Sequence, residues 1–350
     1  MNAEFFSAIA DIEREKGIPQ SYMLEKIEQA LLAALKKSYQ ASAECARVAL
    51  DPVERTVDMF IQKSVVDTVE NPNTQYSVEQ ARELSPDAEV GDLINEPVDT
   101  SGFGRIAAQA AKQVIIQGIR EAERNLIYDE FTSKEHEILT GVVTRVDSRT
   151  GGVSIQIGAT SEHTEAMLSA GERIPNELLK DGDRIKVYVI EVRKSTRGPQ
   201  ILVSRTHPGL VKRLFELEVP EIFEGIVEIR SIAREAGNRT KIAVYSNDSD
   251  VEPIGACVGP KGDRVTSIVN ELGGEKIDIV KFSDDPNEYI ASALAPSDVV
   301  SVTVLEDGKS CRVVVPDNQL SLAIGKEGQN VRLAARLTGF KIDIKPESLA

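Results

Sequence analysis

Hydrophobic spacing divides the chain into an α/β part, a β-rich part and a repeated part. In the first part, leucine and isoleucine recur at i, i+3, i+7 and i+11 from Leu24, which predicts an amphipathic helix over residues 19–39. Two β-rich runs, at 46–50 and 56–66, follow it and predict a hairpin. The helices predicted after the hairpin lie at residues 77–84 and 105–128.

Short apolar runs separated by turn residues follow this part. Five such runs in about 70 residues predict a small closed barrel, for which the OB fold is a common solution. The turn between the last two runs carries a basic cluster formed by Arg193, Lys194 and Arg197. The five predicted strands lie within residues 138–147, 151–157, 164–168, 184–193 and 199–205.

An internal repeat occupies the chain beyond Pro208. GACVGPKGDRVTSIVNELGGEKIDIV aligns with LAIGKEGQNVRLAARLTGFKIDIK, so that Gly259 aligns with Gly325 and Gly262 with Gly328. Each copy has the predicted order α-β-β-α-GxxG-α-β, which is typical of a KH domain. A tight turn between two helices presents free N–H groups at the start of the second helix, and these groups favour phosphate. The glycines let the nucleic-acid backbone approach closely.

Charge is distributed unevenly along the chain. The formal net charge is −15, and residues 1–135 alone carry −10, whereas the barrel region is nearly neutral. An acidic region of this kind is repelled by nucleic acid. We therefore expect a division of labour, with a protein partner for the N-terminal part and RNA for the rest.

Several classes of site are excluded by composition. The three cysteines are far apart and form no C-x-x-C motif, which argues against zinc and disulfides and fits a reducing cytoplasm. The three histidines are too widely spaced to suggest an acid–base site. An acidic N-terminus argues against a secretory signal, and no run is long enough to span a membrane. We expect a cytoplasmic protein with no cofactor, metal or catalytic activity.

The order of these parts, together with several specific stretches, resembles the bacterial NusA family of transcription termination/antitermination proteins. The resemblance covers essentially the whole chain and implies an α+β multidomain fold: an α/β N-terminal domain with a long linker helix, an OB-fold barrel of the ribosomal S-one type and two tandem type II KH domains. The stretches that carry it are FGRIAAQAAKQVI, EVPEI, KIAV, EPIGACVG, ELGGEKIDIV, ALAPSDV and IGKEGQNVRLA. The domains expected from it are 1–135, 136–206, 207–282 and 283–350.

The resemblance also implies partners. The N-terminal domain would bind the RNA polymerase core, while the barrel and KH domains would bind nascent single-stranded RNA. Such a protein modulates pausing, intrinsic termination and antitermination without catalysis, and joins other antitermination factors. We expect a monomer, and the short join near residues 206–208 predicts a stiff RNA-binding unit. Two alternatives remain: a ribosome-associated RNA-binding protein, which the acidic charge disfavours, and an accessory part of an RNA-degrading enzyme.

The family's RNA-binding role is carried over by position. The first loop is Gly259 to Gly262 and the second is Gly325 to Gly328, and three further polar residues follow in the first turns of the next helices. Base stacking contributes about 1–3 kcal/mol per base, and the barrel region holds one aromatic residue, Tyr188, so we expect weak barrel binding. The carboxylate of Glu327 should weaken phosphate binding at the second loop. The candidate RNA-binding residues are Gly259, Pro260, Lys261, Gly262, Arg264, Gly325, Lys326, Glu327, Gly328, Asn330, Arg332, Arg193, Lys194 and Arg197.

Overall fold

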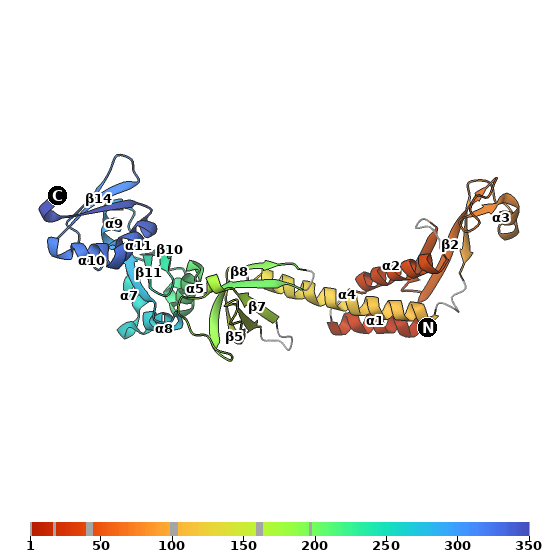
Figure 1. Ribbon diagram of the computed structural model, residues 1–350, viewed down its shortest axis with the longest axis horizontal. Helices are drawn as coiled ribbons and strands as arrows, with labels where there is room; N and C mark the ends of the chain where they lie inside the picture. The colour runs from red at the N-terminus through yellow and green to blue at the C-terminus, as the bar shows by residue number, and fades with distance from the viewer. Residues whose placement is uncertain are drawn as a thin grey trace. The chain divides into compact units, whose positions relative to one another are not determined.

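Two compact units, Met1–Leu126 and Ile127–Ala350, make up the chain in the computed structural model (Figure 1). Their buried apolar residues form separate clusters, so that each unit has its own hydrophobic core. The structure describes residues 2–16, 19–39, 45–98, 104–158, 164–195 and 198–349.

A four-stranded sheet forms the centre of the first unit. The long strand β2 pairs with β1 and β4 in antiparallel fashion and with β3 in parallel. Helix α2 packs on this sheet, because Ile27, Leu31 and Leu35 are buried in one cluster with Met59 and Ile61 of β2. The elements are α1 (Asn2–Lys16), α2 (Gln20–Tyr39), β1 (Ala46–Asp51), β2 (Thr56–Val66), β3 (Gln75–Ser77), α3 (Val78–Leu84) and β4 (Leu93–Pro97).

The predicted amphipathic helix, the hairpin and the short helix of this unit are confirmed. Helix α3 begins with a capping box, in which Ser77 and Gln80 each bond the other's backbone N–H. The sequence did not predict α1, β3 or β4. Strand β3 has only three residues and β4 ends at Pro97, so neither carries enough alternation to be recognised.

One long helix, α4 (Gly104–Thr132), belongs mostly to the first unit and confirms the predicted long helix. Its last residues belong to the second unit, where Phe131 is 2% exposed and lies in the barrel core.

The five strands of the barrel close in the order β5-β6-β7-β9-β8, with β8 pairing back to β5. Burial alternates along β6, where Val153, Ile155 and Ile157 face inward. This alternation is what a half-buried strand requires, and the predicted barrel is confirmed. The strands are β5 (Ile138–Val146), β6 (Val153–Ile157), β7 (Thr164–Leu168), β8 (Arg184–Arg193) and β9 (Gln200–Ser204), with a 3-10 turn η1 (Ala170–Glu172).

The two predicted repeats are also confirmed, and each contains a three-stranded mixed sheet. In each sheet the first two strands are antiparallel and the third is parallel to the second. The first repeat contains α5 (Pro208–Glu218), α6 (Pro220–Phe223), β10 (Val227–Glu235), β11 (Arg239–Ser246), α7 (Pro253–Val258), η2 (Pro260–Gly262), α8 (Asp263–Glu271) and β12 (Lys276–Lys281). The second contains α9 (Pro286–Ala293), β13 (Ser301–Val304), β14 (Ser310–Val315), η3 (Asp317–Gln319), α10 (Leu320–Ile324), η4 (Lys326–Gly328), α11 (Gln329–Thr338), β15 (Lys341–Pro346) and η5 (Glu347–Leu349).

A buried arginine joins the barrel to the first repeat. Arg205 is 1% exposed, and its guanidinium donates to the Glu177 carboxylate of the barrel at 2.6 and 3.0 Å. The same guanidinium donates to the carboxylate and carbonyl oxygens of Glu271, at the end of α8, at 3.0 and 2.7 Å. Nearby, the Tyr188 ring stacks on His207 with centroids 4.6 Å apart. The close join that the sequence predicts near residues 206–208 is therefore a packed contact.

The first repeat is joined to the second through one face of its sheet. Ala233, Ala243 and Val280 point away from the helices of their own repeat and lie in the same buried cluster as Leu333 and Leu337 of α11. The second repeat thus completes a core to which the first contributes three strands.

Candidate nucleic-acid interface

A four-residue loop connects two helices in each repeat, and the two loops have the same backbone conformation. Gly259 has φ 76° and ψ 175°, and Gly325 has φ 76° and ψ 169°. The third residue of the loop, Lys261 in the first and Glu327 in the second, has φ 54° in both. The repeated sequence therefore encodes a repeated geometry.

The first glycine of each loop is required by its dihedral angles and by its neighbours. Its φ and ψ fall in a region that only glycine adopts without strain. A Cβ atom on Gly259 would lie 2.6 Å from Cγ of Arg264, and one on Gly325 would lie 2.8 Å from the backbone nitrogen of Asn330. The helix that follows thus packs directly against the loop, and a side chain would separate them.

Both loops present backbone N–H groups at the start of a helix. Helices α8 and α11 have nine and ten residues, and no side chain among the described residues caps either of them at its N-terminus. These N–H groups and the helix dipole favour an anion, and the glycines remove side chains from its path. The geometry can hold a phosphate of a nucleic-acid backbone.

Two of the predicted contact residues support the loops from within the protein. Nη1 of Arg264 donates to the carbonyl of Ala256 at 2.6 Å and to the Glu221 carboxylate at 2.8 Å. Asn330 occupies the equivalent position in the second repeat and is 4% exposed. Its amide nitrogen donates to the carbonyl oxygens of Leu294 and Ala323, both at 3.0 Å.

The structure places the Asn330 side chain inside the domain, and the RNA contact proposed for this residue stays a prediction. Its amide nitrogen points into the domain, where two carbonyl groups need a donor. The sequence contained no direct signal of this, because an asparagine in the first turn of a helix is equally suited to a ligand.

The predicted contact residue Arg332 is held by the first repeat. Its Nε atom lies 2.8 Å from Oε1 of Glu235, and its Nη1 atom donates to the carbonyl of Glu327 at 3.1 Å. Glu235 also accepts from Arg336 at 2.5 Å and from Gln329 at 2.8 Å. Hydrogen bonding from Arg332 lowers the pKa of Glu235 from 4.5 to about 2. The first turns of α11 are thus anchored to the first repeat by a carboxylate that sequence reasoning missed.

Exposed charges remain at the tips of the loops. Lys261 and Lys326 are exposed, and within the described part of the chain neither forms an ion pair. Glu327 is also exposed, and its left-handed backbone directs it away from the domain core. A phosphate at the second loop would therefore meet one cation and one carboxylate.

Comparison with known proteins gives four family models in sequence order. They are the NusA N-terminal domain over residues 4–125, the S1 RNA binding domain over 132–204, the NusA-like first KH domain over 205–282 and the NusA-like second KH domain over 286–350. The chain is 51% identical over 350 residues to the transcription termination/antitermination protein NusA of Halalkalibacterium halodurans, an alignment that covers 100% of this chain and 90% of that protein.

Two other relatives extend the same result. The NusA protein of Bacillus subtilis is 52% identical, with 99% of this chain and 92% of that protein covered. The NusA protein of Thermus thermophilus is 42% identical, with 100% and 92% covered. The chain belongs to the NusA family.

In this NusA-family chain, the one aromatic residue of the S1 barrel and the first arginine of its predicted basic cluster are both engaged within the protein. Tyr188 is 7% exposed, and its hydroxyl bonds Nδ1 of His136 at 3.3 Å, so the one aromatic ring of the barrel lies in the joint with the first KH domain. Arg193 is paired with Glu191 at 2.6 Å. Arg197 lies outside the described residues.

Lys194 is the described member of the predicted basic cluster that is not ion-paired. Its Nζ atom lies 4.4 Å from the ring centroid of Tyr128, which belongs to α4. The barrel strands alone could not reveal this ring, because it precedes them in the sequence. Lys194 and Tyr128 thus place a cation beside a half-buried aromatic ring on the barrel.

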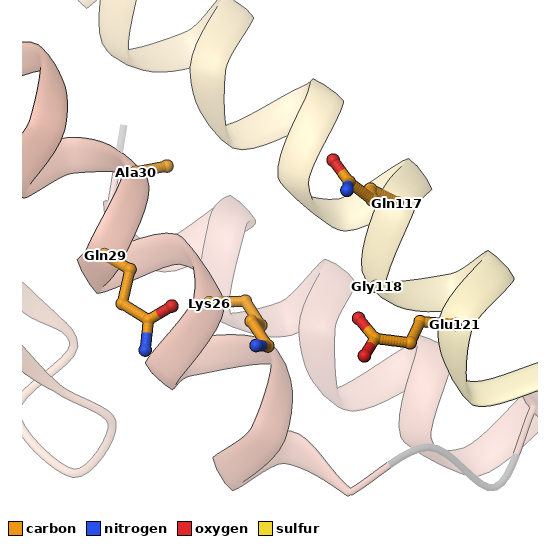
Figure 2. Close-up of a pocket in the computed structure, with 6 residues that line it drawn as sticks. All are labelled: Lys26, Gln29, Ala30, Gln117, Gly118 and Glu121. Carbon is orange, nitrogen blue, oxygen red and sulfur yellow. The ribbon is translucent and has the colours of Figure 1, made fainter. Parts of the chain in front are cut away.

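The N-terminal unit of the NusA-family chain has a polar groove between α2 and α4 with a volume of about 330 Å³. Figure 2 shows Lys26 of α2 and Glu121 of α4 facing each other across it, with Gly118 leaving space between the helices. The remaining lining residues are Gln29, Ala30 and Gln117.

No group of three or more metal-binding side chains is found among the residues that the structure describes. Within the same residues, no helix is long and apolar enough to cross a membrane.

Proposed function

We propose that this chain is a transcription factor that docks on RNA polymerase and holds nascent single-stranded RNA, and that it thereby influences pausing, termination and antitermination. The names of its relatives and its RNA-binding domain types support this function. We assign polymerase binding to residues 1–135 and RNA binding to the domains 136–206, 207–282 and 283–350. The protein would act in the cytoplasm, as a monomer without catalysis, alongside other antitermination factors.

The observation that carries the RNA-binding part is the duplicated loop. Two segments 66 residues apart have matching dihedral angles, uncapped helix starts and an exposed lysine. A KH loop of this geometry holds about four single-stranded nucleotides. We propose that RNA contacts both loops, chiefly through backbone N–H groups and through Lys261 and Lys326.

Charge reversal in the first loop tests this assignment. Pro260 and Lys261 are exposed, and replacing both with aspartate adds negative charge without disturbing the core. RNA affinity should fall while the melting temperature is unchanged. The salt dependence should have a slope of roughly −0.7 per phosphate contacted. Wild-type RNA affinity in this variant would exclude the loop as a clamp.

The acidic charge of the N-terminal part supports the polymerase assignment. Residues 1–135 carry a formal net charge of −10, which opposes binding to RNA. A fragment of these residues should co-purify with RNA polymerase and should not retain RNA. Retention of RNA without polymerase would contradict the proposed division of labour.

A further inference from the structure

The two KH sheets differ on one face, which we call the outer face because it points away from the helices of its own repeat. In the first repeat this face carries an apolar patch, in which Ala233, Ala243 and Val280 are at most 3% exposed. Helices α9 and α11 of the second repeat cover it, since Ile290 and Leu333 lie in the same buried cluster.

Strand pairing gives the equivalent positions in the second repeat. Lys241 pairs with Asp278 in the first sheet, and Arg312 pairs with Asp343 in the second. Counting from these pairs, Thr303 takes the place of Ala233. Val314 takes the place of Ala243, and Lys345 takes the place of Val280. Two of the three apolar positions have become polar.

The outer face of the second repeat is also open and positively charged. Ser301, Thr303, Arg312 and Lys341 are exposed, whereas the alternate residues of the same strands pack against the helices that Figure 1 shows beside β14. Three cations, from Arg312, Lys341 and Lys345, share this face with the carboxylate of Asp343, and the carboxylate of Asp307 interacts electrostatically with Lys341.

The cations on the two faces also differ in their pairing. On the first outer face, Arg239 and Lys241 both bond Asp278, at 2.7 and 3.0 Å. On the second, no ion pair involves Arg312, Lys341 or Lys345 within the described chain. Their charges are therefore available to a ligand.

We propose that the outer face of the second repeat binds the phosphate backbone of single-stranded RNA, as a surface additional to the two loops. Arginine, lysine, serine and threonine are the side chains that contact phosphates. Among the described residues of this face no aromatic ring is exposed, so it would track the backbone without reading bases. Its described apolar residues are Val314, which is half-buried, and Leu305 at its edge, so the face lacks the aromatic anchors of protein interfaces. The inference rests on the RNA-binding part of the proposed function.

The test uses the full chain and uridine oligomers of about 6 and about 24 nucleotides, since one loop spans about four nucleotides. The double variant Arg312→Gln/Lys341→Gln should bind the long oligomer about tenfold more weakly and the short one as the wild type does. Its salt-dependence slope for the long oligomer should fall by about 1.4, for two lost phosphate contacts. The matched control is Lys36→Gln/Lys37→Gln, which removes the same charge from α2 and should change neither affinity.

Each outcome has one reading. An unchanged affinity and slope for the long oligomer would show that the outer face is exposed to solvent and does not contact RNA. That result would overturn the inference but not the assignment of the two loops. If the charge-reversed first loop also bound normally, the proposed RNA function itself would fail. Loss of polymerase binding with normal RNA binding would assign the face to an acidic protein and would also overturn the inference. Should Arg312→Gln lower the melting temperature, Thr303→Asp adds a negative charge at an exposed position and carries the same expectation.

Discussion

Glu235 of the first KH domain and Arg332 of the second are joined by an ion pair of 2.8 Å, although 97 residues separate them in the sequence. Arg336 and Gln329 bond the same carboxylate. One carboxylate of the first KH domain thus holds three side chains of α11, in addition to the apolar core that the two domains share.

Replacing that side chain should loosen the tandem. Glu235→Ala removes bonds to three partners, and charge-assisted hydrogen bonds of this kind contribute about 1.5–3 kcal/mol. Urea unfolding of the full chain should show a second unit destabilised by about that amount, and RNA that spans both loops should bind more weakly than RNA that fits one. Glu228→Ala on the same strand is the control, since its partners Arg230 and Asn247 both belong to the first KH domain. Equal effects of the two variants would contradict the anchoring role.

The two loop glycines should differ in their tolerance of alanine. Both substitutions force a residue into glycine-only backbone space, at about 1–3 kcal/mol. Gly325→Ala should cost more than Gly259→Ala, because it meets the backbone nitrogen of Asn330, whereas the neighbour of Gly259 is the flexible side chain of Arg264. Thermal denaturation measures the difference. Gly308→Ala, with φ 63° and open space around it, is the control. A larger loss for Gly259→Ala would show that helix α11 shifts more easily than helix α8 to make room for a Cβ atom.

Asn330 should matter for stability and not for RNA contact. Asn330→Ala removes the side-chain donor of the Ala323 carbonyl and one donor of the Leu294 carbonyl, which Ser297 still bonds, and a buried carbonyl left without its donor costs about 1–3 kcal/mol. Asn330→Asp should be worse, because its carboxylate would face those carbonyls. RNA affinity measured well below the melting temperature should be unchanged. A loss of affinity at full stability would restore a direct contact.

Arg205 should hold the barrel and the first KH domain together as one cooperative unit. Arg205→Met leaves Glu177 partly buried and unpaired and leaves Glu271 with Lys186 as its remaining partner, and breaking a buried pair in this way costs about 3–5 kcal/mol. Calorimetry should then resolve a separate barrel transition. Adding Glu177→Gln should recover part of the loss; a double variant no better than the single one would show that the charge is not the cause.

The same joint should weaken in mild acid. Burial lowers the pKa of His207 below 6.5, and its Nδ1 atom accepts from the Gly209 N–H at 3.0 Å, so the folded state requires the neutral ring. Below about pH 6.5 the unfolded chain binds more protons at this histidine than the folded chain does. The stabilising contribution of the neutral ring is therefore complete above about pH 6.5 and is lost as the pH falls below it. The melting temperature of the second unit should therefore drop between about pH 7 and pH 5. His207→Asn keeps an acceptor at the helix start and should flatten this dependence; an unchanged pH profile would point to another group.

Local sequence predicted the elements and the loops well, and the reasons are physical. Glycine spacing and helical periodicity are short-range signals, and they placed both KH loops and the five barrel strands correctly. The directions of the first-turn side chains depend on distant partners. Asn330 faces carbonyls that α9 and α10 bring to it, and Arg332 faces a strand of another domain.

The same distinction applies to the aromatic residue of the barrel. Composition identified Tyr188 as the one ring in the region, and the expectation of a weak stacking surface followed from its being alone. Its burial against His207 could not be predicted, because it requires knowing that the barrel packs on α5.

The covered outer face of the first KH sheet has a practical consequence for dividing the chain. A fragment that stops after β12 would expose Ala233, Ala243 and Val280 to water and leave Lys241 without the carbonyl of Ala295, to which it donates at 2.7 Å. Such a fragment should be prone to self-association, because a bare sheet face is a surface on which another copy can pack. For expression, labelling or crystallisation, the two KH domains are therefore best handled as a single piece.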